Sequence, residues 1–123
     1  MKSLVFNFDN KSPIYLQIID QIELYIVSGK IPPGEKLPSV RDLATIARVN
    51  PNTMQRALTE LEQLKLITTE RTNGKFVTTN ENYLYKFREK FALIKTREYL
   101  TAMSELGFDH KSTIKYLKAK GAK

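Results

Sequence analysis

Apolar side chains recur at helical spacing in the first quarter of the chain, which predicts an amphipathic helix. The helix should begin at Ser12 and Pro13, because serine is a good N-cap and proline is favoured at the first helical position. It should end before Gly29, which suits the left-handed conformation of a C-terminal cap. The predicted buried stripe is Ile14, Leu16, Ile18, Ile19, Ile22, Tyr25, Ile26 and Val27.

Two shorter helices follow, separated by a tight turn. The first should open at Ser39, with an acidic residue three positions later as in a capping box. The second should open at Asn50 and Pro51, which repeat the cap-then-proline signal, and run to about residue 64. A small residue such as Ala44 lets two helices cross closely, so the pair has the pattern of a helix–turn–helix. The predicted inward positions are Leu43, Ala44, Ala47, Met54, Ala57, Leu58, Leu61 and Leu64.

A short β-hairpin is predicted directly after these helices. Residues 66–71 and 75–79 would form its strands, on either side of Thr72, Asn73 and Gly74. Asn-Gly is the strongest two-residue hairpin signal, because both positions tolerate positive φ. The strands alternate poorly between apolar and polar residues, so the turn carries this prediction.

From residue 80 the pattern predicts a long helix that Gly107 ends and a short helix that Asp109 starts. The long helix has two apolar stripes, and two stripes need two surfaces to bury them. One surface can be the domain itself, and a second subunit would provide the other. The first stripe is Tyr83, Leu84, Phe87, Phe91, Ile94, Tyr99, Ala102 and Leu106. Leu93, Leu100 and Met103 form the second stripe, and Ile114 and Leu117 mark the buried side of the last helix.

These elements together predict a mainly α fold with a small β-hairpin wing. We expect a winged helix–turn–helix over residues 1–79 and a two-helix dimerisation region over residues 80–123. At 123 residues and 41% hydrophobic content, the chain can form one small domain with an appendage. In this layout the polar side of the second short helix can enter a DNA major groove.

The charge distribution adds little to that prediction. The net charge of +7 favours a polyanionic partner. However, residues 35–79 carry seven cations against five anions, whereas residues 80–123 carry ten against five. Most of the excess therefore lies outside the helix–turn–helix, and the residue pattern is the stronger argument for DNA binding.

Several classes of protein are disfavoured by what the sequence lacks. It has no cysteine, and His110 is its only histidine, so we expect no metal, no cofactor and no catalytic triad. No apolar run approaches the roughly 18–20 residues that cross a bilayer, and no signal peptide is evident at the N-terminus. The sequence predicts a cytoplasmic protein that is not an enzyme and has no membrane partner.

A set of motifs in order over residues 11–79 resembles the DNA-binding domain of the GntR family of bacterial transcription regulators. The motifs are Ser12-Pro13-Ile14-Tyr15, Gln17-Ile18, Gly29, Pro33-Gly34-Glu35, Leu37-Pro38-Ser39-Val40-Arg41-Asp42-Leu43-Ala44, Val49-Asn50-Pro51-Asn52-Thr53 and Gly74-Lys75-Phe76-Val77. The Asn-Pro-Asn-Thr helix start and the short tail are similar to the YtrA subfamily. That subfamily has a small two-helix dimerisation region in place of a large effector-binding domain.

The resemblance implies a homodimer that binds a palindromic operator on double-stranded DNA, usually to repress a nearby operon, often one for transport. The DNA contacts that it implies are Ser39, Arg41, Asn50, Asn52, Thr53, Gln55, Arg56, Gly74 and Lys75. The expected dimer contacts are Leu84, Phe87, Phe91, Ile94, Leu100 and Met103. Two departures stand out, because Arg48 and Lys65 occupy positions where glycine is usual.

Elementary chemistry assigns a role to each implied contact on the second short helix. The amides of Asn52 and Gln55 can pair with adenine N6 and N7, although Asn52 could instead support the helix start and Gln55 could be a solvated residue. Thr53 could donate to a phosphate or satisfy the helix backbone locally.

The cationic candidates have similar alternatives. Arg41 and Arg56 could contact phosphate or guanine, and Arg41 could instead pair with a carboxylate on the surface. Lys75 beside Gly74 suits a wing tip that reaches the minor groove or the DNA backbone, or else a plain solvated turn. Each neutralised phosphate should steepen the salt dependence of binding by about 0.9 in log–log slope.

One alternative function stays open at this stage: an architectural or protein-interaction winged helix without sequence-specific DNA binding. The amide-rich start of the recognition helix argues against it, since a protein-binding face would be more apolar. The short tail leaves little room for a private ligand cavity. A small-molecule effector could still bind at the dimer interface, where aromatic residues converge.

Overall fold

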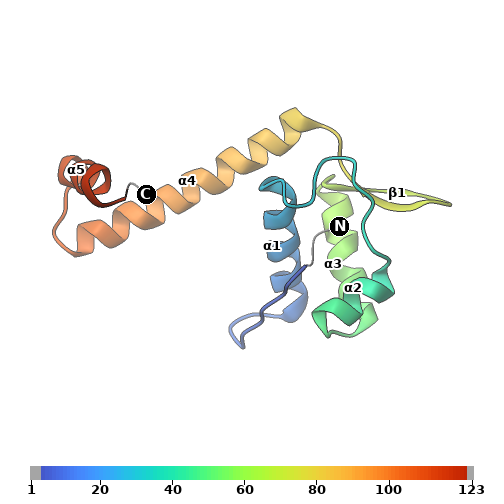
Figure 1. Ribbon diagram of the computed structural model, residues 1–123. Helices are drawn as coiled ribbons and strands as arrows, with labels where there is room; N and C mark the ends of the chain where they lie inside the picture. The colour runs from blue at the N-terminus through green and yellow to red at the C-terminus, as the bar shows by residue number, and fades with distance from the viewer. Residues whose placement is uncertain (1–3, 122–123) are drawn as a thin grey trace. The chain divides into compact units, whose positions relative to one another are not determined.

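The computed structural model describes residues 4–121, within which five helices and one two-stranded sheet are found (Figure 1). The elements are α1 (Ile14–Val27), α2 (Val40–Ala47), α3 (Pro51–Gln63), β1 (Ile67–Glu70), β2 (Gly74–Val77), α4 (Glu81–Glu105) and α5 (His110–Lys120). The mainly α fold with a β-hairpin wing is therefore confirmed. The chain forms two compact units, one ending at Tyr85 and one starting at Lys86, and each is described by itself.

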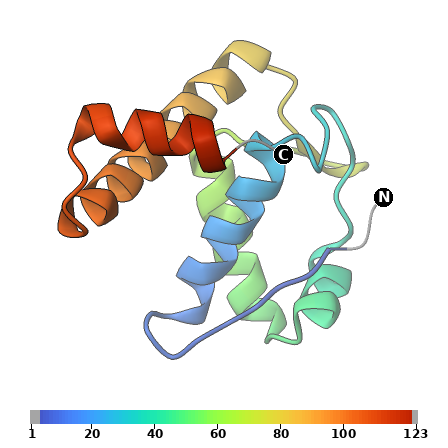
Figure 2. The ribbon, with the colours of Figure 1, turned by 60° about the vertical axis from the view of Figure 1, so that its left-hand side comes forward.

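The core of the first unit forms around α3, which packs against α1, α2 and β1. Figure 2 shows α1 and α3 lying side by side. The largest fully buried side chains come from α1, α2, α3, the two strands and the loops beside them: Ile18, Ile22, Ile26, Ile31, Leu43, Met54, Leu58, Leu61, Leu66, Ile67 and Val77. Two residues predicted to face inward are exposed instead. Leu16 is 40% exposed, because it lies at the edge of the buried side of α1. Leu64 is 37% exposed, because it is the C-cap of α3 and lies beyond the last buried turn.

The start of α1 differs from the prediction by one residue. Pro13 is the N-cap, with its ψ of 142° outside the helical range, and Ser12 lies before it. The Pro13 carbonyl accepts the N–H groups of Leu16 and Gln17 at 3.2 and 3.3 Å, so no serine side chain is needed to begin the helix. At the other end Gly29 has the predicted positive φ of 83°.

Helices α2 and α3 both end at a left-handed residue that is not glycine: Arg48 with φ 58° and Lys65 with φ 63°. After α3, the N–H groups of Lys65 and Leu66 donate to the carbonyls of Glu62 and Leu61 at 2.9 and 3.1 Å. These paired bonds are those of a Schellman motif, which usually has glycine at the left-handed position. A β-carbon there costs about 1–2 kcal/mol, so both cations occupy strained turns.

The hairpin turn lies one residue earlier than predicted. The strands are antiparallel, with Glu70 paired to Gly74, so the connection is residues 71–73. The N–H of Asn73 donates to the Glu70 carbonyl at 3.2 Å, and positive φ occurs at Gly74 (108°) and not at Asn73. The Asn-Gly pair therefore does not form the two-residue turn that its sequence suggests. Glycine instead begins β2 in a conformation that other residues rarely adopt.

Strand β2 is also bonded on its other side, to the segment that precedes α2. The N–H of Leu37 donates to the Lys75 carbonyl at 2.8 Å, and the N–H of Val77 donates to the Glu35 carbonyl at 2.9 Å. Because this segment leads directly into Ser39, the bonds connect the wing to the start of α2.

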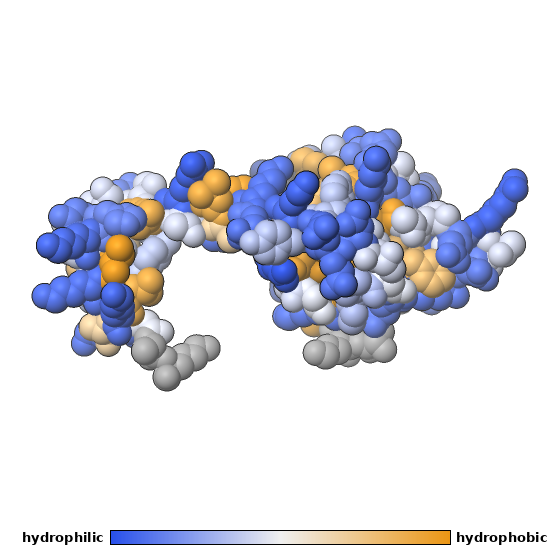
Figure 3. Space-filling model, turned by 90° about the horizontal axis from the view of Figure 1, so that it is seen from above, coloured by the Kyte–Doolittle hydropathy of each residue, from blue (hydrophilic) through white to orange (hydrophobic). Residues whose placement is uncertain are grey.

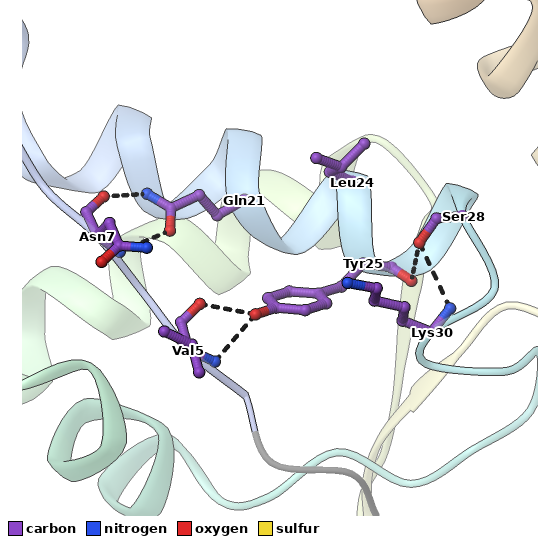
Figure 4. A pocket seen from close by; sticks show the side chains of 7 residues that line it. All are labelled: Val5, Asn7, Gln21, Leu24, Tyr25, Ser28 and Lys30. Atoms are coloured by element: carbon purple, nitrogen blue, oxygen red, sulfur yellow. Dashed lines mark hydrogen bonds between the residues drawn. The ribbon is translucent and has the colours of Figure 1, made fainter. Parts of the chain in front are cut away.

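The segment before α1 runs along that helix and is bonded to it by side chains, a feature that the sequence pattern did not predict. Three α1 residues at four-residue spacing each accept from the N–H and donate to the C=O of one residue in the segment. The pairs are Gln17 with Asp9, Gln21 with Asn7 and Tyr25 with Val5, at 2.7–3.0 Å. Figure 4 shows two of these pairs beside a pocket of about 430 Å³. A helical turn matches two residues of extended chain closely enough to allow this ladder.

The second unit contains most of α4 and all of α5. Asp109 starts α5 as predicted, because its Oδ1 accepts the Ser112 N–H at 2.8 Å and its own N–H donates to Ser112 Oγ at 2.9 Å. Gly107 ends α4 with a φ of 95°, also as predicted.

The buried side of α5 is not the predicted one. Ile114 and Leu117 are 42% and 51% exposed, whereas Thr113 is buried and donates to the Asp109 carbonyl at 2.7 Å. Met103 is the buried apolar residue of α4 in this unit. Figure 3 shows hydrophobic side chains at the surface among hydrophilic ones. Periodicity identified apolar residues on α5, but among the described residues of this unit nothing buries them.

Candidate nucleic-acid interface

The polar sides of α2 and α3 face outward because their apolar sides pack together. Leu43, Ala44 and Ala47 of α2 and Met54, Ala57 and Leu58 of α3 are all buried. The predicted contact residues on these helices are accordingly exposed, except Thr53, which is half-buried: Ser39, Arg41, Asn50, Asn52, Thr53, Gln55 and Arg56. The structure thus brings the residues predicted on these two helices onto the outward side of the helix pair.

Side-chain caps fix the start of each helix. Ser39 Oγ accepts the Asp42 N–H at 3.1 Å, and Asn50 Oδ1 accepts the Asn52 N–H at 2.7 Å, so both predicted N-caps are confirmed. The cap uses the side-chain Oδ1 of Asn50 and the backbone N–H of Asn52, so the Asn52 side chain stays exposed. Asn52 therefore presents one amide donor and one amide acceptor at the start of α3, a pair that matches the adenine edge.

Gln55 lies on the same outward side. Its Nε2 donates to Thr59 Oγ1 at 3.2 Å, and the Thr59 hydroxyl donates to the Gln55 carbonyl at 2.9 Å. Both residues are exposed. An exposed bond of this kind contributes about 0.5–1.5 kcal/mol and exchanges readily with a better partner. It orients the amide without burying it.

The two arginines have different surroundings. Arg56 places its guanidinium carbon 3.7 Å from the ring centroid of Tyr15, near the start of α1. Arg41 is exposed on α2, and within residues 4–121 no carboxylate lies within ion-pair distance of it. The surface ion pair considered for Arg41 is therefore absent from the described part of the chain.

Lys75 is not at the exposed end of the wing. Its Nζ contacts Glu62 Oε1 at 2.6 Å and Thr69 Oγ1 at 3.0 Å, and its side chain is 16% exposed. Burial raises the pKa of Glu62, but hydrogen bonds from Lys75 and Thr69 outweigh it and lower the pKa below its ordinary value. This network ties β2 to α3, and a DNA contact by Lys75 stays a prediction.

Arg71 is the cation that the turn itself exposes, and it was not among the predicted contact residues. Its place beside the predicted turn was the available signal. Because that turn was predicted one residue too late, Arg71 was assigned to the end of a strand. Gly74 is constrained by its neighbour, because a β-carbon there would lie 3.1 Å from Lys36 Cε. A groove of about 660 Å³ runs between the start of α2 and the wing, with Ser39, Lys36 and Arg71 among its lining residues.

Two N-capped helices at a tight turn, an amide-bearing outward side and an adjacent hairpin define a winged helix–turn–helix DNA-binding domain. Residues 14–77 match the family described as "Bacterial regulatory proteins, gntR family". The chain belongs to this family, and it is a DNA-binding transcriptional regulator.

Two proteins from Bacillus subtilis have sequences similar to more than half of this chain. It is 36% identical over 111 residues to the uncharacterized HTH-type transcriptional regulator YhcF of Bacillus subtilis (strain 168), covering 90% of this chain and 92% of that one. It is 46% identical over 71 residues to the HTH-type transcriptional repressor YtrA of the same organism, covering 58% and 55%. Both of these relatives are named as HTH-type transcriptional regulators or repressors, in agreement with the family assignment.

Solved structures of DNA-binding regulators have a similar fold. A GntR family transcriptional regulator from Listeria monocytogenes has a TM-score of 0.81 and 39% identity, covering 91% of this chain and 98% of that one. The DNA-binding domain of AraR in complex with operator ORX1 has a TM-score of 0.57 and 26% identity, covering 63% and 100%.

The predicted dimer residues fall into two groups. Leu84 and Met103 are 7% and 8% exposed, so they already pack within the single chain. Phe87, Phe91 and Leu100 are half-buried and Ile94 is 43% exposed, so these retain surface for a partner. Within residues 4–121 no helix is long and apolar enough to cross a membrane.

Proposed function

We propose that the protein is a homodimeric repressor that reads a palindromic operator through the start of α3. The observation that carries this is the pair of exposed amides, Asn52 and Gln55, on a helix start that Asn50 fixes. One bidentate amide–adenine pair gives roughly 1–3 kcal/mol of base discrimination. Arg41, Thr53 and the wing then supply phosphate contacts that set the register. The solved complex of the similar AraR DNA-binding domain with an operator supports operator binding by this fold.

The wing contact belongs to Arg71 rather than to Lys75 in this proposal. Arg71 is exposed at the turn, whereas the Lys75 ammonium is held by Glu62. Gly74 lets the hairpin pass close to Lys36. Lys75 therefore acts by fixing the wing, and Arg71 reaches the DNA.

Dimerisation is assigned to residues 80–123, with residues 1–79 as the DNA-binding domain. The support is the exposed apolar surface of α4, which includes Leu93 and Ile94 at 50% and 43% exposure. Neighbouring water-exposed aliphatic side chains favour burial against another apolar surface. A second copy of the chain offers the same surface, and an isologous contact would relate two α3 helices by a two-fold axis, as a palindrome requires.

Repression is favoured by the similarity to YtrA, which is named as a transcriptional repressor. Control of a transport operon follows only from the subfamily resemblance. Any effector would act at the dimer interface by changing the separation of the two α3 helices, which must match half-sites about one helical turn apart. An effector that released DNA while solution scattering showed an unchanged dimer would contradict this mechanism.

Selection of bound fragments from a random DNA pool tests the function directly. We expect the wild type to select a palindrome, and Asn52→Ala or Gln55→Ala to lose preference at one position of each half-site. Gln63→Ala, on an exposed residue at the other end of α3, is the matched control and should select the wild-type sequence. An unselective wild-type pool would favour the architectural alternative instead.

A further inference from the structure

Arg56 is held in a particular way that distinguishes it from the other exposed cations of the interface. Its guanidinium carbon lies 3.7 Å from the centroid of the Tyr15 ring, within stacking distance. Within residues 4–121 the guanidinium makes no hydrogen bond and no ion pair. Tyr15 is half-buried, while Arg56 is exposed.

A stacked guanidinium keeps all of its hydrogen-bonding capacity. Its five N–H donors lie in the plane of the group, and an aromatic ring occupies only the face. A carboxylate partner would have consumed those donors, as Glu62 consumes the donors of Lys75. The Tyr15 ring therefore restricts the rotamers of Arg56 and leaves its donors available to a third group.

The location of the pair indicates what that third group is. Arg56 follows Gln55 and lies one helical turn after Asn52, so it adjoins the residues proposed to read bases. The ring that holds it belongs to α1, so the guanidinium is drawn to the α1 side of α3. A cation at the edge of a helix that lies in a groove faces the DNA backbone.

We propose that Tyr15 is a positioning residue that presents Arg56 to a DNA phosphate. This inference rests on the proposed function, since it assigns one contact of the same interface. Tyr15 itself does not need to touch DNA. Its effect is to order the Arg56 side chain before binding, so that less conformational freedom is lost when the phosphate contact forms.

A purely structural role for the pair makes a different prediction. Helices α1 and α3 already bury Ile18, Ile22, Met54 and Leu58 between them and their neighbours. If the Tyr15 ring only supported the fold through its other contacts, losing it would affect DNA binding equally whether or not Arg56 were present. If Tyr15 acts through Arg56, its effect on DNA binding must vanish once Arg56 is removed.

The test is a double-mutant cycle on the operator selected by the wild type, measured at several salt concentrations. Tyr15→Leu should weaken binding about 2- to 5-fold, the range expected for an exposed cation–π contact. Tyr15→Phe retains the ring and should bind as the wild type does. Arg56→Ala should lower the log–log salt slope by about 0.9, the value for one lost phosphate contact. Tyr15→Leu should then add nothing to Arg56→Ala.

Three results would overturn the proposal. One is an equal loss from Tyr15→Leu with and without Arg56, and another is a loss in Tyr15→Phe. The third is unchanged binding in Tyr15→Leu. Thermal unfolding of each variant identifies any loss that comes from the fold, and a variant that unfolds early is replaced by Tyr15→Met. If the wild type selects no operator, the proposed function fails as well; if it does and the cycle shows no coupling, only this inference fails.

Discussion

The two units of the chain treat their apolar side chains in opposite ways. In the first unit, Ile18, Met54 and Leu58 are 0% exposed. In the described part of the second unit, Leu93 is 50% and Leu117 is 51% exposed, and Met103 is the buried apolar residue. The first unit buries an apolar core of its own, whereas the second leaves most of its apolar side chains where burial against another molecule would stabilise them.

This difference separates two tasks. A unit with a complete core can hold Asn50, Asn52 and Gln55 in fixed positions, which is what reading a DNA sequence needs. A unit with an incomplete core can associate, which is what setting the distance between two reading helices needs. Substitutions that change one unit and leave the other intact therefore test whether DNA reading and dimerisation are divided between the two units.

The largest expected effect is on the core of the first unit. Leu58→Ala should lower the free energy of unfolding by about 2–5 kcal/mol, because it removes a fully buried side chain and leaves a cavity. The same change at half-exposed Leu93 should cost well under that, about 0.5 kcal/mol or less in the monomer. Urea unfolding at low protein concentration checks both, and equal losses would contradict the contrast.

The next effect is on association. Ile94→Asp should weaken the dimer at least about tenfold, because a carboxylate would be buried against an apolar surface without a partner. Thr96→Asp places the same charge on another face of α4 and is the matched control. Sedimentation equilibrium measures both variants. A dimer that tolerates Ile94→Asp would exclude this face of α4 from the interface.

A smaller effect concerns the tie between the wing and α3, and it depends on pH. Because the folded pKa of Glu62 lies below its unfolded value of 4.5, its ion pair stabilises the fold above that value and the contribution is lost as pH falls through the folded pKa. Glu62→Gln should therefore cost about 1 kcal/mol at pH 7, and the gap to the wild type should close in acid. Unfolding measured at pH 7 and pH 3 checks this, and a gap that widened in acid would contradict it.

The smallest effect concerns the strained end of α3. Lys65→Gly should leave stability unchanged or raise it by up to about 1 kcal/mol, because glycine adopts the φ of 63° without a steric penalty. Gln63→Gly, two residues earlier within the helix, should instead cost about 1 kcal/mol. Thermal unfolding of the two variants distinguishes them, and a destabilised Lys65→Gly would show that the lysine side chain contributes more than its backbone strain costs.

Interactions between residues close in the sequence could be predicted, whereas interactions between distant residues could not. The caps at Ser39, Asn50 and Asp109 depend on neighbours two or three residues away, and all three were correct. The pairing of Lys75 with Glu62 spans 13 residues and was not visible in any local pattern.

Two further misses have the same origin. The stack of Arg56 on Tyr15 and the ladder along α1 join segments whose contact only the fold creates. The exposure of Ile114 and Leu117 was missed for a different reason, since a periodic stripe specifies an apolar side without specifying what covers it.

The central claim is that the start of α3 determines which sequence is read and that α4 determines how two copies are spaced. DNA selection from a random pool with Ile94→Asp tests it most directly. The account predicts the same half-site sequence as the wild type, without its palindromic repeat. A changed half-site, or an intact palindrome bound by a monomeric variant, would contradict it.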